Sequence, residues 1–214
     1  MTPHGVKRLR LPVTDLPRRA LPGLLLALAA CARRVVEPPP GMALRGEVVL
    51  LRGLANVFST GMDRLASRLA AAGFAAEVGN HLDWPAEAER LIDASRNGVV
   101  RRPVAVIGHS LGADDAIRLA GAAGASGVAL DLLVTFDPVH VDVVLPGPRR
   151  VMNFYLEGGL WGRPLRPGPG FDGSLENTDV GAEGVTHFDI DKSEALHARV
   201  LAALERQARP PDPI

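Results

Sequence analysis

A serine stands between two glycines in the segment GHSLG (108–112). An apolar strand pattern over 103–108 leads into Ser110, and helical spacing over 111–123 begins directly after it. A serine at such a junction sits on a sharp, strained turn, where the flanking glycines remove β-carbons that would collide with the neighbouring strand and helix. The hydroxyl then stands clear of the sheet, as a nucleophile requires. The amide of Leu111 at the helix N-terminus favours negative charge beside it.

The residues GHSLGA (108–113) and their surroundings resemble the α/β-hydrolase family, in particular its lipase-like members, over roughly residues 47–205. The resemblance implies a nucleophile, an acid and a histidine in that order along the chain. It also implies an active site at the carboxyl ends of parallel strands. The plainer interpretations are a glycine-rich turn or a phosphate-binding loop, although the segment lacks the Gly-Lys-Ser/Thr ending of a P-loop.

The general base that the resemblance implies is a histidine between the last strand and the last helix, and His187 occupies that place. A serine hydroxyl is a weak nucleophile until such a base accepts its proton. The alternative for His187 is an ordinary surface histidine. The other five histidines fit the order less well: His4 in the leader, His81 and His109 before the nucleophile, His140 beyond the fourth strand, and His197 inside the last helix.

The acid that orients the imidazole is expected at the end of a strand. Asp137 ends the fourth predicted strand in the sequence TFDP (135–138), which is similar to pancreatic-type lipases. Glu157, after the fifth strand, is the first alternative, and Asp172 and Asp179 are weaker ones. Asp137 also fits a turn-capping carboxylate before proline.

The second oxyanion donor implied by the resemblance is the amide of Leu54, which would pair with that of Leu111. The segment LRGL (51–54) stands where the family has His-Gly-x, with arginine in place of histidine. Asn56 and Ser59 are polar candidates nearby, and the plain alternative is a strand-to-loop turn.

These residues together predict a serine hydrolase that cleaves ester-type acyl bonds through an acyl-serine intermediate. The chemistry requires no cofactor, and no Cys/His cluster has the spacing of a zinc site. The alternatives are a thioesterase, acyltransferase or peptidase on the same fold, or a binding protein that has kept the fold.

The elements that must position this site alternate along the chain. Strands are predicted over 47–54, 74–79, 103–108, 129–136 and 149–158, and helices over 61–72, 85–97, 111–123 and 193–207. This order predicts an α/β fold: a small α/β-hydrolase domain over 47–208, with a mostly parallel sheet of about five to six strands and helices on both faces. A domain of about 170 residues leaves little room for a cap, so we expect an open site.

The segment 157–186 interrupts the alternation, because it is rich in glycine and proline. Long loops of this kind are often functional. Trp161 and Phe171 are its candidate substrate contacts, and an ordered surface loop pinned by two aromatic residues is the equal alternative. Asp114 and Asp115, in the first turns of the helix after Ser110, are expected to be structural, since a carboxylate there suits the helix dipole.

The N-terminal region has the layout of an export signal. Arg18 and Arg19 precede an apolar run, and LAAC (28–31) resembles the lipobox of bacterial lipoproteins, in which Cys31 is lipidated. We therefore expect a leader over 1–31, a proline-rich linker over 32–46 and a short tail over 209–214. The expected location is the bacterial cell envelope with a lipid anchor, and the alternative is a cytoplasmic protein with a short apolar helix.

Composition narrows the partners. Lys+Arg and Asp+Glu are both 24, so the formal net charge is zero, and aromatic residues make up 4%. Neither a basic field nor stacking platforms for nucleic acid are present. The expected partner is a small-molecule or lipid acyl ester, and the expected state is a monomer.

Overall fold

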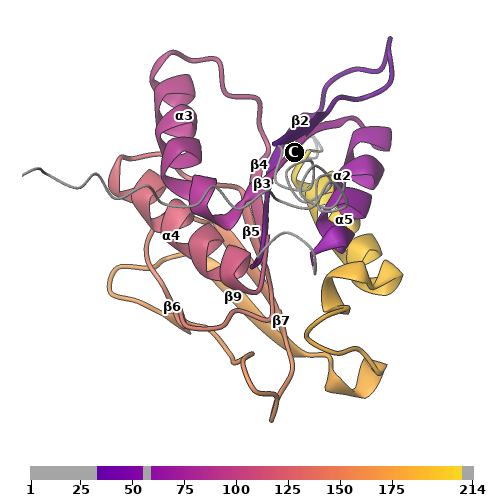
Figure 1. Cartoon of the computed structure of the whole chain (residues 1–214). Helices are drawn as coiled ribbons and strands as arrows, with labels where there is room; N and C mark the ends of the chain where they lie inside the picture. The colour runs from indigo at the N-terminus through magenta and orange to yellow at the C-terminus, as the bar shows by residue number, and fades with distance from the viewer. Residues whose placement is uncertain (1–32, 55–58, 209–214) are drawn as a thin grey trace, which may run out of the picture. The chain divides into compact units, whose positions relative to one another are not determined.

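The computed structural model describes residues 33–54 and 59–208. The predictions for the leader with Cys31, for Asn56 and for the tail 209–214 lie outside these residues. Seven strands form one sheet in the order β1-β3-β2-β4-β5-β7-β9, and every neighbouring pair is parallel except β1 and β3 (Figure 1). The strands are β1 (Arg34–Val36), β2 (Gly46–Arg52), β3 (Phe74–Asn80), β4 (Val104–His109), β5 (Leu132–Phe136), β7 (Arg150–Tyr155) and β9 (Ser174–Asp179).

Helices cover both faces of the sheet, as the alternating pattern predicted (Figure 1). The helices α2 (Thr60–Ala71) and α5 (Glu194–Gln207) pack on one face, where the buried side chains of Leu65 and Val200 belong to the same hydrophobic cluster as Ile107 of β4. The helices α3 (Trp84–Arg96) and α4 (Leu111–Ala125) pack on the other, with Leu91 and Leu119 in that core. The central strands β4 and β5 are buried throughout, which explains why their sequences are continuous apolar runs.

Two strands of the sheet were not predicted. Strand β1 lies inside the predicted linker and pairs with β3 at one edge, so Arg34–Val36 belong to the sheet and not to a spacer. Strand β9 lies inside the predicted loop 157–186 and forms the other edge beside β7. A second, two-stranded sheet, β6 (Val143–Val144) with β8 (Arg166–Pro167), also falls partly in that loop.

Polar side chains hold β9 in place, which is why its sequence SLENTD does not read as a buried strand. The buried Asn153 on β7 donates from its amide to Asn177 Oδ1 at 2.8 Å. Asn177 in turn bonds both the N–H and the carbonyl of Leu165. These hydrogen bonds hold the loop after β7 against the edge of the sheet.

Three neighbouring strands end side by side, and this alignment positions the candidate site. Leu51 of β2 pairs with Gly108 of β4, and His109 of β4 pairs with Phe136 of β5. Because the strands are parallel, the residues that follow them meet at one edge of the sheet. The chain next to these ends carries Gly53, Ser110 and Asp137.

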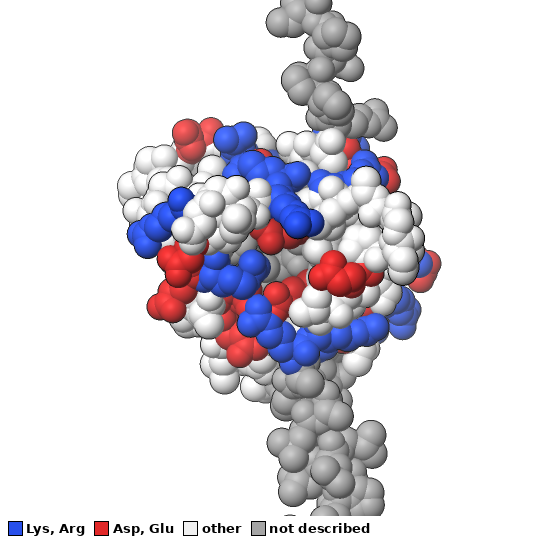
Figure 2. Space-filling view, turned by 90° about the horizontal axis from the view of Figure 1, so that it is seen from above, with Lys and Arg blue, Asp and Glu red and all other residues white. Residues whose placement is uncertain are grey.

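The surface seen in Figure 2 carries basic and acidic side chains interspersed with one another, in line with the balanced composition. No helix within the described ranges 33–54 and 59–208 is long and apolar enough to cross a membrane.

Candidate active site

Ser110 occupies a strained turn between β4 and α4. Its φ and ψ are 60° and −126°, in a region that residues with a β-carbon rarely adopt. The two glycines around it are sterically required. A β-carbon on Gly108 would lie 2.1 Å from the carbonyl oxygen of Gly112, and one on Gly112 would lie 2.2 Å from the carbonyl oxygen of Leu51. The helix therefore approaches both strands so closely that only glycine fits.

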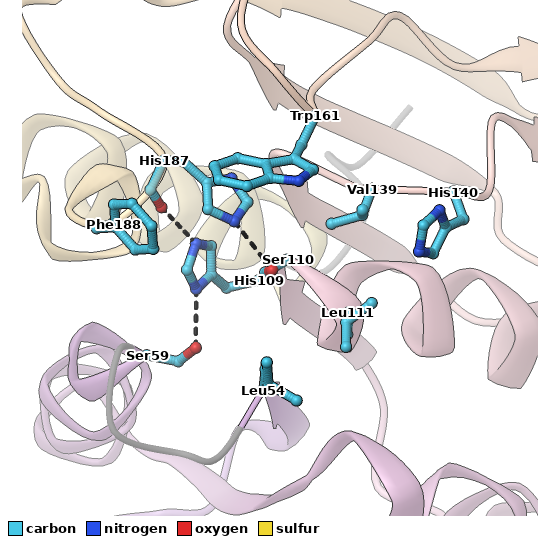
Figure 3. A pocket seen from close by; sticks show the side chains of 10 residues that line it. All are labelled: Leu54, Ser59, His109, Ser110, Leu111, Val139, His140, Trp161, His187 and Phe188. Carbon is cyan, nitrogen blue, oxygen red and sulfur yellow. Dashed lines mark hydrogen bonds between the residues drawn. The ribbon is translucent and has the colours of Figure 1, made fainter.

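A hydroxyl, an imidazole and a carboxylate meet at this turn. Figure 3 shows the hydroxyl of Ser110 and the imidazole of His187. His187 Nε2 lies 3.0 Å from Ser110 Oγ, and His187 Nδ1 lies 2.6 Å from Asp137 Oδ2. An ionised carboxylate only accepts hydrogen bonds, so Nδ1 carries the ring proton. In the neutral imidazole Nε2 is then the acceptor, and it is aimed at the hydroxyl of Ser110.

Asp137 is fixed by the ends of two strands. Its backbone N–H donates to the carbonyl of Phe154 at 2.8 Å, and its second carboxylate oxygen accepts from the amide of Leu156 at 2.9 Å. The side chain is 1% exposed. A β-carbon on Gly162 would lie 1.5 Å from Asp137 Oδ1, so the loop after β7 closes directly over the carboxylate. These contacts leave one carboxylate oxygen free to bond His187.

The competing acids lie elsewhere. The side chain of Glu157 is exposed, and its backbone N–H bonds the carboxylate of Asp179 at 3.1 Å. Asp179 also accepts from the amide of Gly181, and these two amides lower its pKa. Asp172 lines a separate surface hollow beside Gly147.

The loop that carries His187 is shaped by its own turn. The carbonyl of Thr186 accepts from the amides of Asp189 and Ile190, and the carboxylate of Asp189 caps the amide of Thr186. The Trp161 ring lies over the imidazole of His187, with centroids 4.4 Å apart. The loop after β7 therefore packs on the imidazole (Figure 3).

A cavity of about 400 Å³ opens over Ser110. Its walls are mostly apolar, with the side chains of Leu54, Leu111, Val139, Trp161 and Phe188 (Figure 3). Leu54 and Leu111, the two predicted oxyanion residues, therefore flank the serine.

Phe171, a predicted substrate contact, does not line this cavity. It packs instead against the hydrophobic cluster under α3 and α4. The turn that bonds its amide to the carbonyl of Gly168 directs it away from the site. Of the two aromatic residues predicted as substrate contacts in 157–186, Trp161 lines the cavity and Phe171 does not.

Gly53, directly after β2, lies tightly against Ser110. A β-carbon on Gly53 would lie 2.9 Å from the β-carbon of Ser110, so the backbone that leads to Leu54 passes beside this serine. The N–H of Gly53 is already bonded to Ser59 Oγ at 2.9 Å, which excludes it as an oxyanion donor. Arg52, where the resemblance has histidine, makes a two-point bond to Asp63 of α2 at 3.0 and 2.7 Å and so anchors this loop.

Asp114 has a role that the sequence did not reveal. Its buried carboxylate accepts the backbone N–H groups of Val139, His140 and Val141 at 2.9 to 3.1 Å. These residues form the loop after β5 and include two that line the cavity. Asp115 points elsewhere and pairs with His81 at 2.8 Å. Both carboxylates are structural, as expected, but the first also shapes the cavity wall.

His109, inside the nucleophile segment, is 1% exposed. Burial lowers its pKa to about 4, so the ring is neutral near pH 7. Its ring nitrogens bond Ser59 Oγ and the carbonyl of His187, both at 2.8 Å. Within the part of the chain that the structure describes, no group of three or more His, Cys, Asp or Glu side chains is arranged to hold a metal ion.

Solved structures share this architecture. A serine hydrolase without a lid from Xanthomonas campestris matches with a TM-score of 0.55 and 15% identity, covering 81% of this chain and 88% of its own. A type II thioesterase from the borrelidin biosynthetic cluster matches with a TM-score of 0.56 and 14% identity, covering 81% and 96%. The protein has the α/β-hydrolase fold. The esterase domain of a Rhodothermus marinus protein also matches, with a TM-score of 0.53 and 13% identity over 83% and 93% of the two chains.

Matches at the level of sequence are absent. The chain matches no family model, and no curated protein matches it. The likeness to known proteins is therefore one of fold.

Proposed function

We propose that the protein is a serine hydrolase that cleaves carboxylic esters through an acyl-serine intermediate. The observation that carries the proposal is the hydrogen-bonded series Ser110–His187–Asp137 on a strained turn beneath an open, apolar cavity. A structural role would not require the strained serine backbone, because strain of this kind costs about 1–3 kcal/mol and is found mainly at functional sites.

The reaction begins with proton transfer from Ser110 to His187. As the Oγ–carbon bond forms, the carbonyl electrons move to its oxygen, and the amides of Leu54 and Leu111 receive the negative charge. Asp137 holds the proton on Nδ1 and stabilises the imidazolium. When the bond to the leaving alkoxide breaks, His187 returns the proton to that oxygen. Water then repeats the sequence on the acyl-serine and releases the acid.

The cavity favours an uncharged acyl group. Its lining is apolar except for two serines, Ser59 and Ser110, and the histidines, and about 400 Å³ lies within the usual range of small-molecule sites. Each methylene buried there contributes about 0.8 kcal/mol, or about fourfold in kcat/KM, until the cavity is filled. Rates should therefore rise with acyl length and then level off.

The test uses the full chain with p-nitrophenyl esters from acetate to palmitate and with matched thioesters. We expect ester turnover that falls by about 10⁴-fold or more in Ser110→Ala and in His187→Ala. Equal turnover by the parent and Ser110→Ala would overturn the proposal. Faster thioester than ester turnover would keep the nucleophile and assign a thioesterase, the activity of one structural neighbour.

A further inference from the structure

Two buried side chains beside Ser110 and His187 take no part in the reaction described above. Ser59 and His109 are each 1% exposed, and both reach the base of the cavity (Figure 3). Ser59 precedes α2 and His109 ends β4, so 50 residues of chain separate them. Buried polar groups of this kind are costly unless they are fully bonded.

The direction of each hydrogen bond follows from the partners. A carbonyl only accepts, so His109 Nε2 carries a proton and donates it to the carbonyl of His187 at 2.8 Å. The neutral ring then has Nδ1 as an acceptor, and Ser59 donates its hydroxyl proton there at 2.8 Å. Ser59 Oγ accepts in turn from the amide of Gly53 at 2.9 Å. One continuous series of donors runs from Gly53 to the main chain of His187.

This pair is not a second nucleophile and base. The lone pairs of Ser59 Oγ are engaged by the Gly53 amide, and the second nitrogen of His109 is blocked by a carbonyl. Burial holds the pKa of His109 near 4, which makes its imidazole a weak base at neutral pH. Each group is satisfied by its neighbours.

The two ends of the series belong to the two sides of the proposed reaction centre. Gly53 directly precedes Leu54, the proposed oxyanion donor, and the other end is the carbonyl of the base itself. The centre of the series is a side chain of β4, a fully buried strand, and His109 directly precedes Ser110. The series is thus anchored on the same rigid element as the nucleophile.

We propose that Ser59 and His109 are positioning residues, which fix the loop bearing Leu54 and the main chain of His187 relative to Ser110. The inference rests on the proposed function. In this proposal, Ser59 and His109 set the distance between the oxyanion donor, Leu54, and the general base, His187. A displacement of about 1 Å between catalytic groups costs about 100-fold in rate. Loss of the Ser59–His109 hydrogen bond should therefore slow the chemical step more than it weakens substrate binding.

The test compares Ser59→Ala and His109→Gln with the parent full chain. Ser59→Ala removes the two bonds that Ser59 makes, to Gly53 and to His109, and His109→Gln keeps a donor for the carbonyl of His187 but removes the ring acceptor. We expect each variant to lower kcat by about 10-fold or more with KM within twofold of the parent. The double variant should be no slower than the slower single variant, because both changes break one series. Ser67→Ala, at an exposed site on α2, is the matched control and should leave both constants unchanged.

The outcomes separate this inference from the proposed function. Loss of kcat in Ser110→Ala together with unchanged kcat in Ser59→Ala, or a change confined to KM, would overturn the positioning role alone. Equal activity of the parent and Ser110→Ala would overturn the proposed function and the inference with it. If the variants fail to fold, nitrogen-15 NMR of histidine-labelled parent protein still decides. The inference requires the proton of His109 on Nε2, and a proton on Nδ1 would overturn it.

Discussion

Asp114→Asn should weaken both the fold and the wall of the cavity. The carboxylate is 1% exposed and accepts from three successive backbone amides, those of Val139, His140 and Val141. Hydrogen bonds to a charged acceptor contribute about 1.5–3 kcal/mol each, against about 0.5–1.5 kcal/mol for a neutral one. Replacing the charge therefore costs about 1 kcal/mol at each of the three bonds.

Two further effects act on this variant. The new amide group would face the N–H of His140, which lies 3.1 Å from Asp114 Oδ2, so one donor meets another. In the opposite direction, burying a neutral amide costs less free energy than burying a carboxylate, and this difference offsets part of the hydrogen-bond energy that is lost. We expect a decrease of about 2–3 kcal/mol in the free energy of unfolding, measured by urea denaturation and circular dichroism.

The functional result comes from the loop itself. Val139 and His140 line the cavity, so freeing their amides should raise KM for a medium-chain ester several-fold while kcat changes less. Asp115→Asn is the matched control on the next residue of the helix, since its carboxylate pairs with His81 and Arg118. Equal KM values for the two variants, with a stability loss below about 0.5 kcal/mol in Asp114→Asn, would refute this reasoning.

Three further predictions each compare a variant with a matched control or with the parent. Gly112→Ala should destabilise the protein and abolish esterase activity, because the new β-carbon would lie 2.2 Å from the carbonyl oxygen of Leu51. Gly121→Ala in the same helix, where the nearest contact of a β-carbon is 3.5 Å away, should keep activity and raise the melting temperature. Burial raises the pKa of Asp191 to about 6 and lowers that of His109 to about 4. Between pH 6 and pH 4 the folded state therefore binds a proton at Asp191 that the unfolded chain does not bind, which stabilises the fold on acidification. At His109 the unfolded chain binds the proton instead, which destabilises the fold. Because the trend at Asp191 stabilises the folded state on acidification, Asp191→Asn should lose about 2 kcal/mol more than the parent between pH 6 and pH 4, measured by urea unfolding at each pH; an identical slope would contradict this. Trp161→Ala, which removes the ring 4.4 Å from the imidazole, should lower kcat/KM by about 3- to 10-fold, whereas Trp161→Phe should retain most of it.

The turn around Ser110 could be predicted because each of its positions has a local steric reason. The glycines, the apolar strand before them and the helix after them are adjacent in sequence, so their pattern predicts one geometry. The order of the parallel strands then brings Asp137 to the same edge of the sheet. Placing His187 beside them relied on the resemblance, and the structure brings the three side chains within hydrogen-bond distance.

The edges of the fold could not be predicted, because their stability comes from partners distant in sequence. Strand β9 has a polar sequence and is held by Asn153 and Asn177, which no periodicity reveals. The short strand β1 follows its pairing with β3 and not its own pattern. Phe171 was selected as an isolated apolar residue in a loop, but the fold gives it a packing role.

Residues that act through the backbone were also missed. Asp114 carries no motif, and its bonds to the loop after β5 depend on the packing of α4 against that loop. Ser59 and His109 are 50 residues apart, and no sequence pattern indicates that their side chains meet. Side chains that bond distant main-chain groups are found only when the tertiary structure places both ends.

The most direct measurement is the site of covalent labelling by a fluorophosphonate. The reagent reacts with a serine hydroxyl only when a base and an oxyanion site activate it. We expect one adduct per chain, located by mass spectrometry of the peptide that contains Ser110, and its loss in both Ser110→Ala and His187→Ala. An unlabelled parent protein, or equal labelling of the parent and Ser110→Ala, would contradict it.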